Sequence, residues 1–220
     1  MLNRLTRPAL LGLLGLCLMA AGPARALDEG IDYQTLAMPQ PTETGNKVEV
    51  LEFFWYGCPH CYQLEPGLEK WNASKPANVE FRRVPAILGP SWEPGARAYF
   101  AMEQLGVLER LHKPLLRAIH EEKKRLADAN NYVDWMAAQG VDRDEFMKAY
   151  NSFTVDMKVR KVQQMPTKYG IDGVPVLVVN GKYRASQSIA GSTERLFKVL
   201  DTLVAQESGT APAPDPATAK

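Results

Sequence analysis

The chain has 220 residues, of which 45% are hydrophobic and 23% are charged, and its formal net charge at pH 7 is +1. This composition is typical of a globular protein with one or two domains and a sizeable core. Because the net charge is small and no basic stripe is present, nucleic-acid binding is not indicated.

Residues 1–26 have the pattern of a secretory signal peptide. Arg4 and Arg7 precede an apolar run over residues 10–20, and Ala24-Arg25-Ala26 fits a small-x-small cleavage site. The run is shorter than the roughly 20 residues that a membrane-spanning helix needs. We therefore expect export to the periplasm, cleavage after Ala26 and a mature chain that starts at Leu27. An uncleaved membrane anchor is the alternative.

The mature chain keeps two cysteines. Cys17 lies inside the apolar run and is expected to be removed with it, which leaves Cys58 and Cys61. Export places this pair in an oxidising compartment, where thiol pairs tend to form disulfides. A disulfide that closes so short a loop constrains the unfolded chain only weakly, so a structural role is disfavoured. The spacing indicates a reactive pair instead.

The first half of the mature chain predicts a strand, a helix and a second strand. After a weak extended signal at residues 33–36, the apolar run VEVLEFF at residues 48–54 is typical of a strand that is buried on both faces. A helix is expected from Cys58 towards Trp71, with Pro59 in its first turn. The next strand is expected at residues 79–84. Such a βαβ unit implies a parallel pair of strands.

Residues 94–165 have a helical pattern, because apolar residues recur three and four positions apart, as at Ala98, Met102 and Leu105. A short strand is expected at residues 176–179. Asn180-Gly181 then predicts a hairpin turn that leads into a returning strand.

A last amphipathic helix is expected to begin after Ser192. We therefore predict one discontinuous α/β domain over residues 27–93 and 166–207. A helical insertion is predicted at residues 94–165, and a disordered tail at residues 208–220.

The motif Cys58-Pro59-His60-Cys61 places one sulfur at a helix start and the other one turn along, facing inward. Unpaired N–H groups and the positive end of the helix dipole favour Cys58 as a thiolate, and His60 would add to this effect. A stabilised thiolate is a good leaving group, so the oxidised pair is expected to be a strong oxidant.

Two other uses of the motif are weaker. A zinc site needs about four ligands, and the chain has no second cysteine pair, so no metal site is predicted. Haem attachment requires Cys-x-x-Cys-His, whereas Tyr62 follows Cys61.

Three residues before the motif also invite interpretation. Strand alternation puts Glu52 on the same face as Val50 and Phe54, where an isolated buried carboxylate tends to take up a proton. The alternative is a glutamate at the strand end that reaches solvent. Trp55 and Tyr56 are expected to form a hydrophobic rim for unfolded substrates, with simple packing as the alternative.

The segment LEFFWYGCPHCYQLEP, the later segment GVPVLVVNGKYR and the helical insertion closely resemble the DsbA family of periplasmic disulfide-forming proteins. The resemblance covers roughly residues 30–207. It does not include the Pro-rich tail. It implies a thioredoxin-like α/β fold with an inserted all-helical domain.

The resemblance also implies roles for individual residues. Pro175 would be a cis-proline that faces the cysteine pair, and the backbone of Val174 would pair with the bound substrate. Glu52 would lie below the cysteines and tune proton transfer to the inner thiol, with Arg83 as its candidate partner.

The implied activity is a monomeric oxidase that introduces disulfide bonds into newly exported proteins without a dissociable cofactor. A membrane-bound, quinone-linked reoxidase of the DsbB kind would be its partner. A disulfide isomerase or reductase is a weaker alternative, because known isomerases carry an N-terminal dimerisation domain that has no counterpart here. A peptide-binding holdase with incidental cysteines is the alternative from another class.

Overall fold

The computed structural model describes residues 27–210, so the expected signal peptide and most of the expected tail lie outside the described residues. The sheet has five strands in the order β1-β5-β4-β2-β3. Strands β2 and β3 are parallel, as the βαβ pattern predicts, and the other neighbouring pairs are antiparallel. The strand bounds are β1 (Gln34–Thr35), β2 (Val48–Phe54), β3 (Val79–Pro85), β4 (Val176–Val179) and β5 (Tyr183–Ala185).

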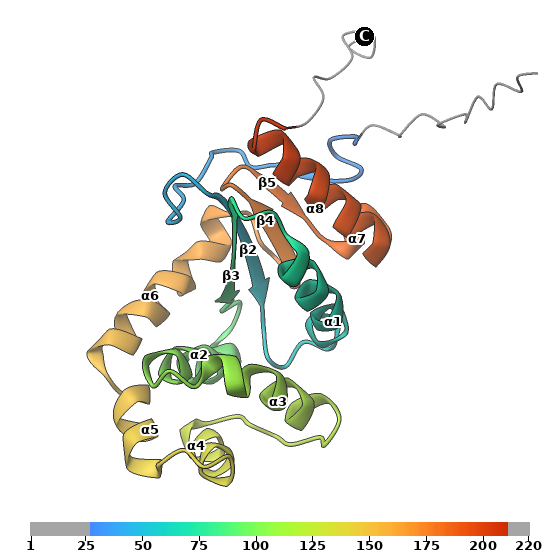
Figure 1. The fold of residues 1–220 in the computed structure, drawn as a ribbon. Helices are drawn as coiled ribbons and strands as arrows, with labels where there is room; N and C mark the ends of the chain where they lie inside the picture. Colours follow the sequence, from blue (N-terminus) through green and yellow to red (C-terminus); the bar gives the residue numbers. More distant parts are fainter. Residues whose placement is uncertain (1–26, 211–220) are drawn as a thin grey trace, which may run out of the picture.

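Helices α1 (Pro59–Ser74) and α8 (Thr193–Glu207) cover one face of the sheet, with the short helix α7 (Gln187–Ala190) beside α8 (Figure 1). Their apolar stripes meet the strands in a dry core around Val50, Leu68 and Leu200, none of which is exposed. Burial of such side chains contributes roughly 2 kcal/mol each. The apolar residues whose pattern predicted the βαβ unit therefore also stabilise it by their burial.

The helical block lies at the end of the sheet where β2 and β3 end (Figure 1). A second core forms around Met102, Leu115 and Phe146, all fully buried. Helix α6 then returns along the other face of the sheet, where Tyr169 packs against Phe53 with ring centroids 5.1 Å apart. The block consists of α2 (Glu93–Gln104), α3 (Leu108–His120), α4 (Ala129–Ala138), α5 (Arg143–Tyr150) and α6 (Phe153–Lys168).

Three local features differ from the sequence-based expectation. Helix α6 continues through the buried Pro166 to Lys168, beyond the expected end at residue 165. A 3₁₀ turn (Pro90–Trp92) precedes α2, and α7 follows β5. Ser186 caps α7 by accepting a hydrogen bond from the N–H of Ile189, an arrangement too short to produce a periodic signal.

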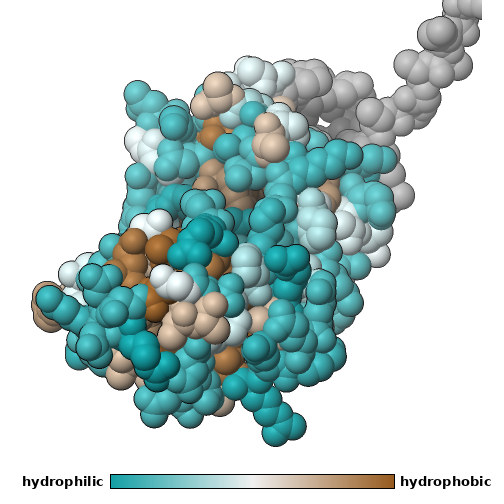
Figure 2. Space-filling model, turned by 60° about the horizontal axis from the view of Figure 1, so that its bottom comes forward, coloured by the Kyte–Doolittle hydropathy of each residue, from teal (hydrophilic) through white to brown (hydrophobic). Residues whose placement is uncertain are grey.

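The surface around the helical block is mainly hydrophilic, with hydrophobic residues gathered in a limited area between hydrophilic ones (Figure 2). Within residues 27–210, no helix combines the length and the apolar character that crossing a membrane requires.

Candidate active site

The motif sits where β2 leads into α1. Cys58 has an extended backbone, with φ −85° and ψ 115°, and is the N-cap residue of α1. Its Sγ accepts a hydrogen bond from the N–H of Cys61 at 3.4 Å. The sulfur therefore takes the place of a capping oxygen and lies at the positive end of the helix.

The two sulfurs have opposite acid–base properties. A hydrogen bond from the Cys61 thiol, helped by backbone N–H groups and the charge of His60, lowers the pKa of Cys58 to about 6, although burial acts against it. Burial, followed by the hydrogen bond that Cys61 donates to Cys58, raises the pKa of Cys61. At neutral pH, Cys58 is therefore mainly a thiolate and Cys61 a thiol.

Both cysteines are well covered. Cys58 is 7% exposed and Cys61 is 2% exposed, so the outer sulfur is less open than a bare helix start suggests. The cover comes from a distant segment, because the carbonyl oxygen of Val174 lies 3.4 Å from Cys58 Sγ. The Val174–Pro175 peptide bond is cis, as the resemblance implies.

A groove of about 580 Å³ begins beside this contact. Its wall includes His60 of the motif, the segment 172–176 and residues 187–189 of α7. The side chain of His60 is exposed. Val174 lines the groove and its carbonyl oxygen contacts Cys58 Sγ, so an extended peptide in this groove would lie close to the outer cysteine.

Glu52 lies in the middle of β2 and is 1% exposed, which rules out the alternative of a glutamate that reaches solvent. Arg83 is its register partner on β3, and Arg83 Nε lies 3.3 Å from Glu52 Oε2. Burial raises the pKa of Glu52 to about 8, while the charge of Arg83 lowers it and the charge of Glu65 raises it. Glu52 can therefore hold a proton at neutral pH next to the cysteine pair.

Two further buried residues join this pair, and sequence patterns did not predict either of them at this site. Glu65 accepts a hydrogen bond from Arg83 Nη2 at 2.6 Å, and His112 Nε2 lies 3.7 Å from the other oxygen of Glu65. Glu65 follows Cys61 by one helical turn, so its position could have been found from the spacing of α1. His112 belongs to the inserted α3, and no local signal connects it to the motif.

Of the two aromatic residues of the loop, Tyr56 does not have the place expected for it. Tyr56 is 1% exposed and packs under the site, so it is not part of a rim. Trp55 is half-buried and stacks on Trp92, with ring centroids 4.4 Å apart. Gly57 is needed here, since a Cβ atom at this position would lie 2.4 Å from the Trp55 ring.

The insertion also holds the loop from the other side. His120 at the end of α3 hydrogen-bonds to the carbonyl oxygen of Tyr56 at 2.7 Å and stacks on Tyr62 of α1. Trp135, Met102 and Met136 are buried in the core of the insertion.

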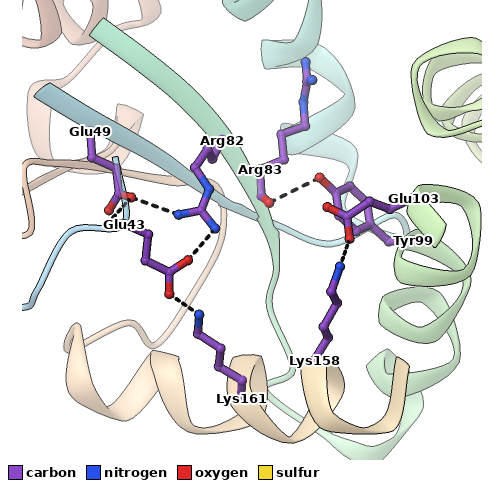
Figure 3. A network of polar contacts seen from close by, with 8 residues as sticks. All are labelled: Glu43, Glu49, Arg82, Arg83, Tyr99, Glu103, Lys158 and Lys161. Atoms are coloured by element: carbon purple, nitrogen blue, oxygen red, sulfur yellow. Dashed lines mark hydrogen bonds and ion pairs between the residues drawn. The ribbon is translucent and has the colours of Figure 1, made fainter. Parts of the chain in front are cut away.

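The side chains of the neighbouring residues Arg82 and Arg83 on β3 lie on opposite faces of the sheet. Figure 3 shows that Arg83 points towards α1, whereas Arg82 points to Glu43 and Glu49, with contacts of 2.8 and 2.9 Å. Lys161 of α6 also contacts Glu43, so these charges tie α6 to the sheet. The Arg82 network is thus structural and separate from the cysteines.

Comparison with known proteins gives consistent matches. The family model "DSBA-like thioredoxin domain" matches residues 77–203. The "Thiol:disulfide interchange protein DsbA" of Azotobacter vinelandii is 42% identical over 178 residues, covering 81% of this chain and 83% of the relative. The protein of that name from Pseudomonas syringae pv. tomato is 37% identical over 195 residues, covering 89% and 91%.

Solved structures agree. A crystallised variant of Pseudomonas aeruginosa DsbA superposes with a TM-score of 0.81 at 38% identity, covering 84% of this chain and 100% of that one. These matches confirm the predicted fold class, a thioredoxin-like α/β fold with inserted helices.

Proposed function

Because this chain belongs to the DsbA-like thioredoxin domain family, it is a thiol:disulfide oxidoreductase that introduces disulfide bonds, and we propose that Cys58 and Cys61 carry out the exchange. The observation that supports this assignment best is the Cys58 sulfur, which caps α1 and accepts hydrogen bonds from Cys61. Every interaction that stabilises the Cys58 thiolate makes the reduced pair more favourable and the oxidised pair a stronger oxidant.

The exchange starts from the oxidised pair. A substrate thiolate attacks Cys58 Sγ, the bond between the two cysteine sulfurs breaks, and Cys61 leaves with the electron pair. A second substrate thiolate then attacks the substrate sulfur of this mixed disulfide and releases Cys58 as a thiolate. The substrate loses two electrons and gains a disulfide, and the pair ends reduced.

Proton transfer to Cys61 is assigned to Glu52. The departing Cys61 sulfur is buried and has a raised pKa, so it needs a proton as it leaves. Glu52 holds a proton at neutral pH and interacts electrostatically with Cys61. After the transfer, the Glu52 carboxylate is balanced by Arg83 at 3.3 Å.

Val174 and Pro175 are assigned to substrate binding. The Val174 carbonyl lies beside the attacking position and can accept a hydrogen bond from the backbone of an extended substrate. Substrates are newly exported proteins with thiol pairs, and a quinone-linked membrane reoxidase of the DsbB kind restores the disulfide. The reaction itself requires no dissociable cofactor, since the cysteine pair carries both electrons.

The proposed place of action is the periplasm. The charged start, the short apolar run and Ala24-Arg25-Ala26 support export and cleavage after Ala26. N-terminal sequencing of the exported protein should then read from Leu27, and an intact Met1 in the membrane fraction would contradict the proposal.

The oxidising direction can be measured directly. Equilibration with glutathione buffers should give a reduction potential above that of thioredoxin, which is about −270 mV, because the Cys58 thiolate favours the reduced pair. Replacing His60 with alanine removes one of the interactions that lower the Cys58 pKa, so this variant should be less oxidising. A potential at or below that of thioredoxin would indicate a reductase instead.

Replacing Glu52 with glutamine should change the pH dependence of exchange and leave the fold intact. The amide fills the same buried site but cannot give a proton to Cys61, so the rate should fall most at neutral pH, where Glu52 is protonated. The check is the rate at which oxidised protein reacts with dithiothreitol, expressed as variant over wild type from pH 5.5 to 9.5. A ratio that stays constant with pH would remove Glu52 from the proton step.

A further inference from the structure

Three buried side chains and the partly buried Arg83 form a continuous line from the cysteine pair into the helical insertion. Glu52 contacts Arg83, Arg83 contacts Glu65, and Glu65 faces His112. Among the described residues, the buried side-chain nitrogen and oxygen atoms without a hydrogen bond are Glu52 Oε2, Arg83 Nε and His112 Nε2. All three atoms belong to this line of side chains. Its charged groups therefore interact over short distances, and hydrogen bonds do not satisfy every polar atom in it.

The surroundings of His112 favour one form of its ring. Tyr56 lies 2.9 Å from His112 Nδ1, and burial raises the pKa of Tyr56 well above its usual value, so its hydroxyl keeps its proton and can donate to Nδ1. The N–H of a neutral imidazole is then on Nε2, which faces Glu65. Burial lowers the pKa of His112, while Glu65 opposes this effect.

We propose that His112 is a positioning residue for disulfide exchange. His112 supports the Glu65 carboxylate, so that Glu65 shares Arg83 with Glu52. Glu52 therefore keeps its proton. This inference rests on the proposed role of Glu52. His112 touches neither cysteine and acts through Glu65 and Arg83.

The electrostatic argument has two steps. Burial acts to raise the pKa of Glu65, but contact with His112 and the charge of Arg83 outweigh it and lower the pKa. The ionised Glu65 then competes for Arg83 and repels a charge on Glu52, which keeps Glu52 protonated at neutral pH. If Glu65 lost His112, it would take up a proton more easily, and Arg83 would be free to stabilise an ionised Glu52.

The groups around His112 come from every neighbouring element. Besides Tyr56 and Glu65, the charge of Arg83 on β3 lowers the His112 pKa and that of Glu109 on α3 raises it. Tyr99 of α2 packs edge-on against the ring at 6.2 Å and keeps its proton, since burial raises its pKa. Glu65 of α1 is the carboxylate within ion-pair distance of the ring, with 3.7 Å between its Oε2 and His112 Nε2.

The test substitutes the ring without emptying the site. His112→Phe keeps the edge-on packing against Phe54 but has no N–H for Glu65. His112→Gln keeps an N–H donor and should restore the wild-type behaviour. Glu65→Gln removes the competing charge directly and should act like His112→Phe. Arg110→Gln is the matched control, because Arg110 is an exposed residue of α3 that bonds to the Gln139 carbonyl.

Two readouts follow Glu52 itself. The first is the NMR chemical shift of the Glu52 side-chain carboxyl carbon as a function of pH, assigned by comparison with Glu52→Gln. Its titration midpoint should move about one pH unit lower in His112→Phe and Glu65→Gln. As the pH rises, the rate at which these two variants react with dithiothreitol should begin to fall below the wild-type rate at a correspondingly lower pH. In the Glu52→Gln background, His112→Phe should add no further change of the pH profile.

The outcomes separate the two proposals. A wild-type titration in His112→Phe would overturn the role of His112 whatever Glu65→Gln shows, while leaving that of Glu52. A shift in His112→Phe that His112→Gln does not reverse would indicate packing rather than support of Glu65, and would also overturn it. An unchanged pH profile in Glu52→Gln alone would remove the proton step instead.

Discussion

Replacing Cys61 with alanine is expected to abolish catalytic disulfide formation and to leave substrate proteins covalently bound to Cys58. Without Cys61, no internal disulfide can form, and a mixed disulfide on Cys58 cannot be resolved from within the protein. Cys58 lies next to the groove and the Val174 carbonyl, where a substrate can reach it. Non-reducing gels of periplasmic extracts should show the adducts, and reducing agent should release them.

Two variants control this result. Cys58→Ala should trap nothing, because Cys61 is only 2% exposed and its raised pKa keeps it a thiol. Cys61→Ser keeps a hydroxyl donor for Cys58, so it should form adducts faster than Cys61→Ala at neutral pH, given that the Cys61 hydrogen bond contributes most to lowering the Cys58 pKa. Adducts of equal strength in Cys58→Ala and Cys61→Ala would refute these roles. Full activity of Cys58→Ala would support the holdase alternative.

The second large effect concerns stability. We expect the reduced protein to gain stability over the oxidised protein as the pH rises, until the reduced form is the more stable one. The Cys58 pKa is about 6 in the folded protein and about 8.5 in an unfolded chain. Since the folded pKa is depressed, the thiolate contribution is complete above the unfolded pKa and is lost as the pH falls through 6.

The magnitudes place the crossover near neutral pH. The thiolate contributes about 1.4 kcal/mol at pH 7 and about 3 kcal/mol at pH 9. The chain-entropy model gives the disulfide about 2 kcal/mol for so short a loop. The oxidised form should therefore be more stable in acid, and the reduced form more stable above about pH 7.5.

Paired urea titrations of both forms at pH 5, 7 and 9 measure this difference. The free-energy gap should move by about 2 kcal/mol in favour of the reduced form between pH 5 and pH 9. The Cys58 thiolate gain of about 3 kcal/mol is partly offset because Cys61 ionises more easily in the unfolded chain than in the folded protein. Cys58→Ala lacks the thiolate, so its stability should not show this gain with pH. A gap between the two wild-type forms that is independent of pH would mean that the folded protein does not stabilise the Cys58 thiolate.

Local signals were sufficient for the framework of the site. The apolar run at residues 48–54 and the cysteine spacing with Pro59 in the first helical turn predict a strand and a helix start within a short stretch of chain. These features depend on backbone periodicity and capping, which involve neighbours in sequence. For that reason the parallel β2–β3 pair and the position of Cys58 at the start of α1 were predictable.

The electrostatics of the site depend on contacts that periodicity does not encode. Val174 reaches Cys58 across 116 positions of the sequence, and His112 enters from an inserted helix to face Glu65. The burial of Tyr56, which was expected at a rim, likewise results from packing against the insertion. A pKa depends on which charges and how much water surround a group in three dimensions. The motif therefore indicates the chemistry, whereas only the packed structure decides which buried groups set the protonation of Glu52 and Cys61.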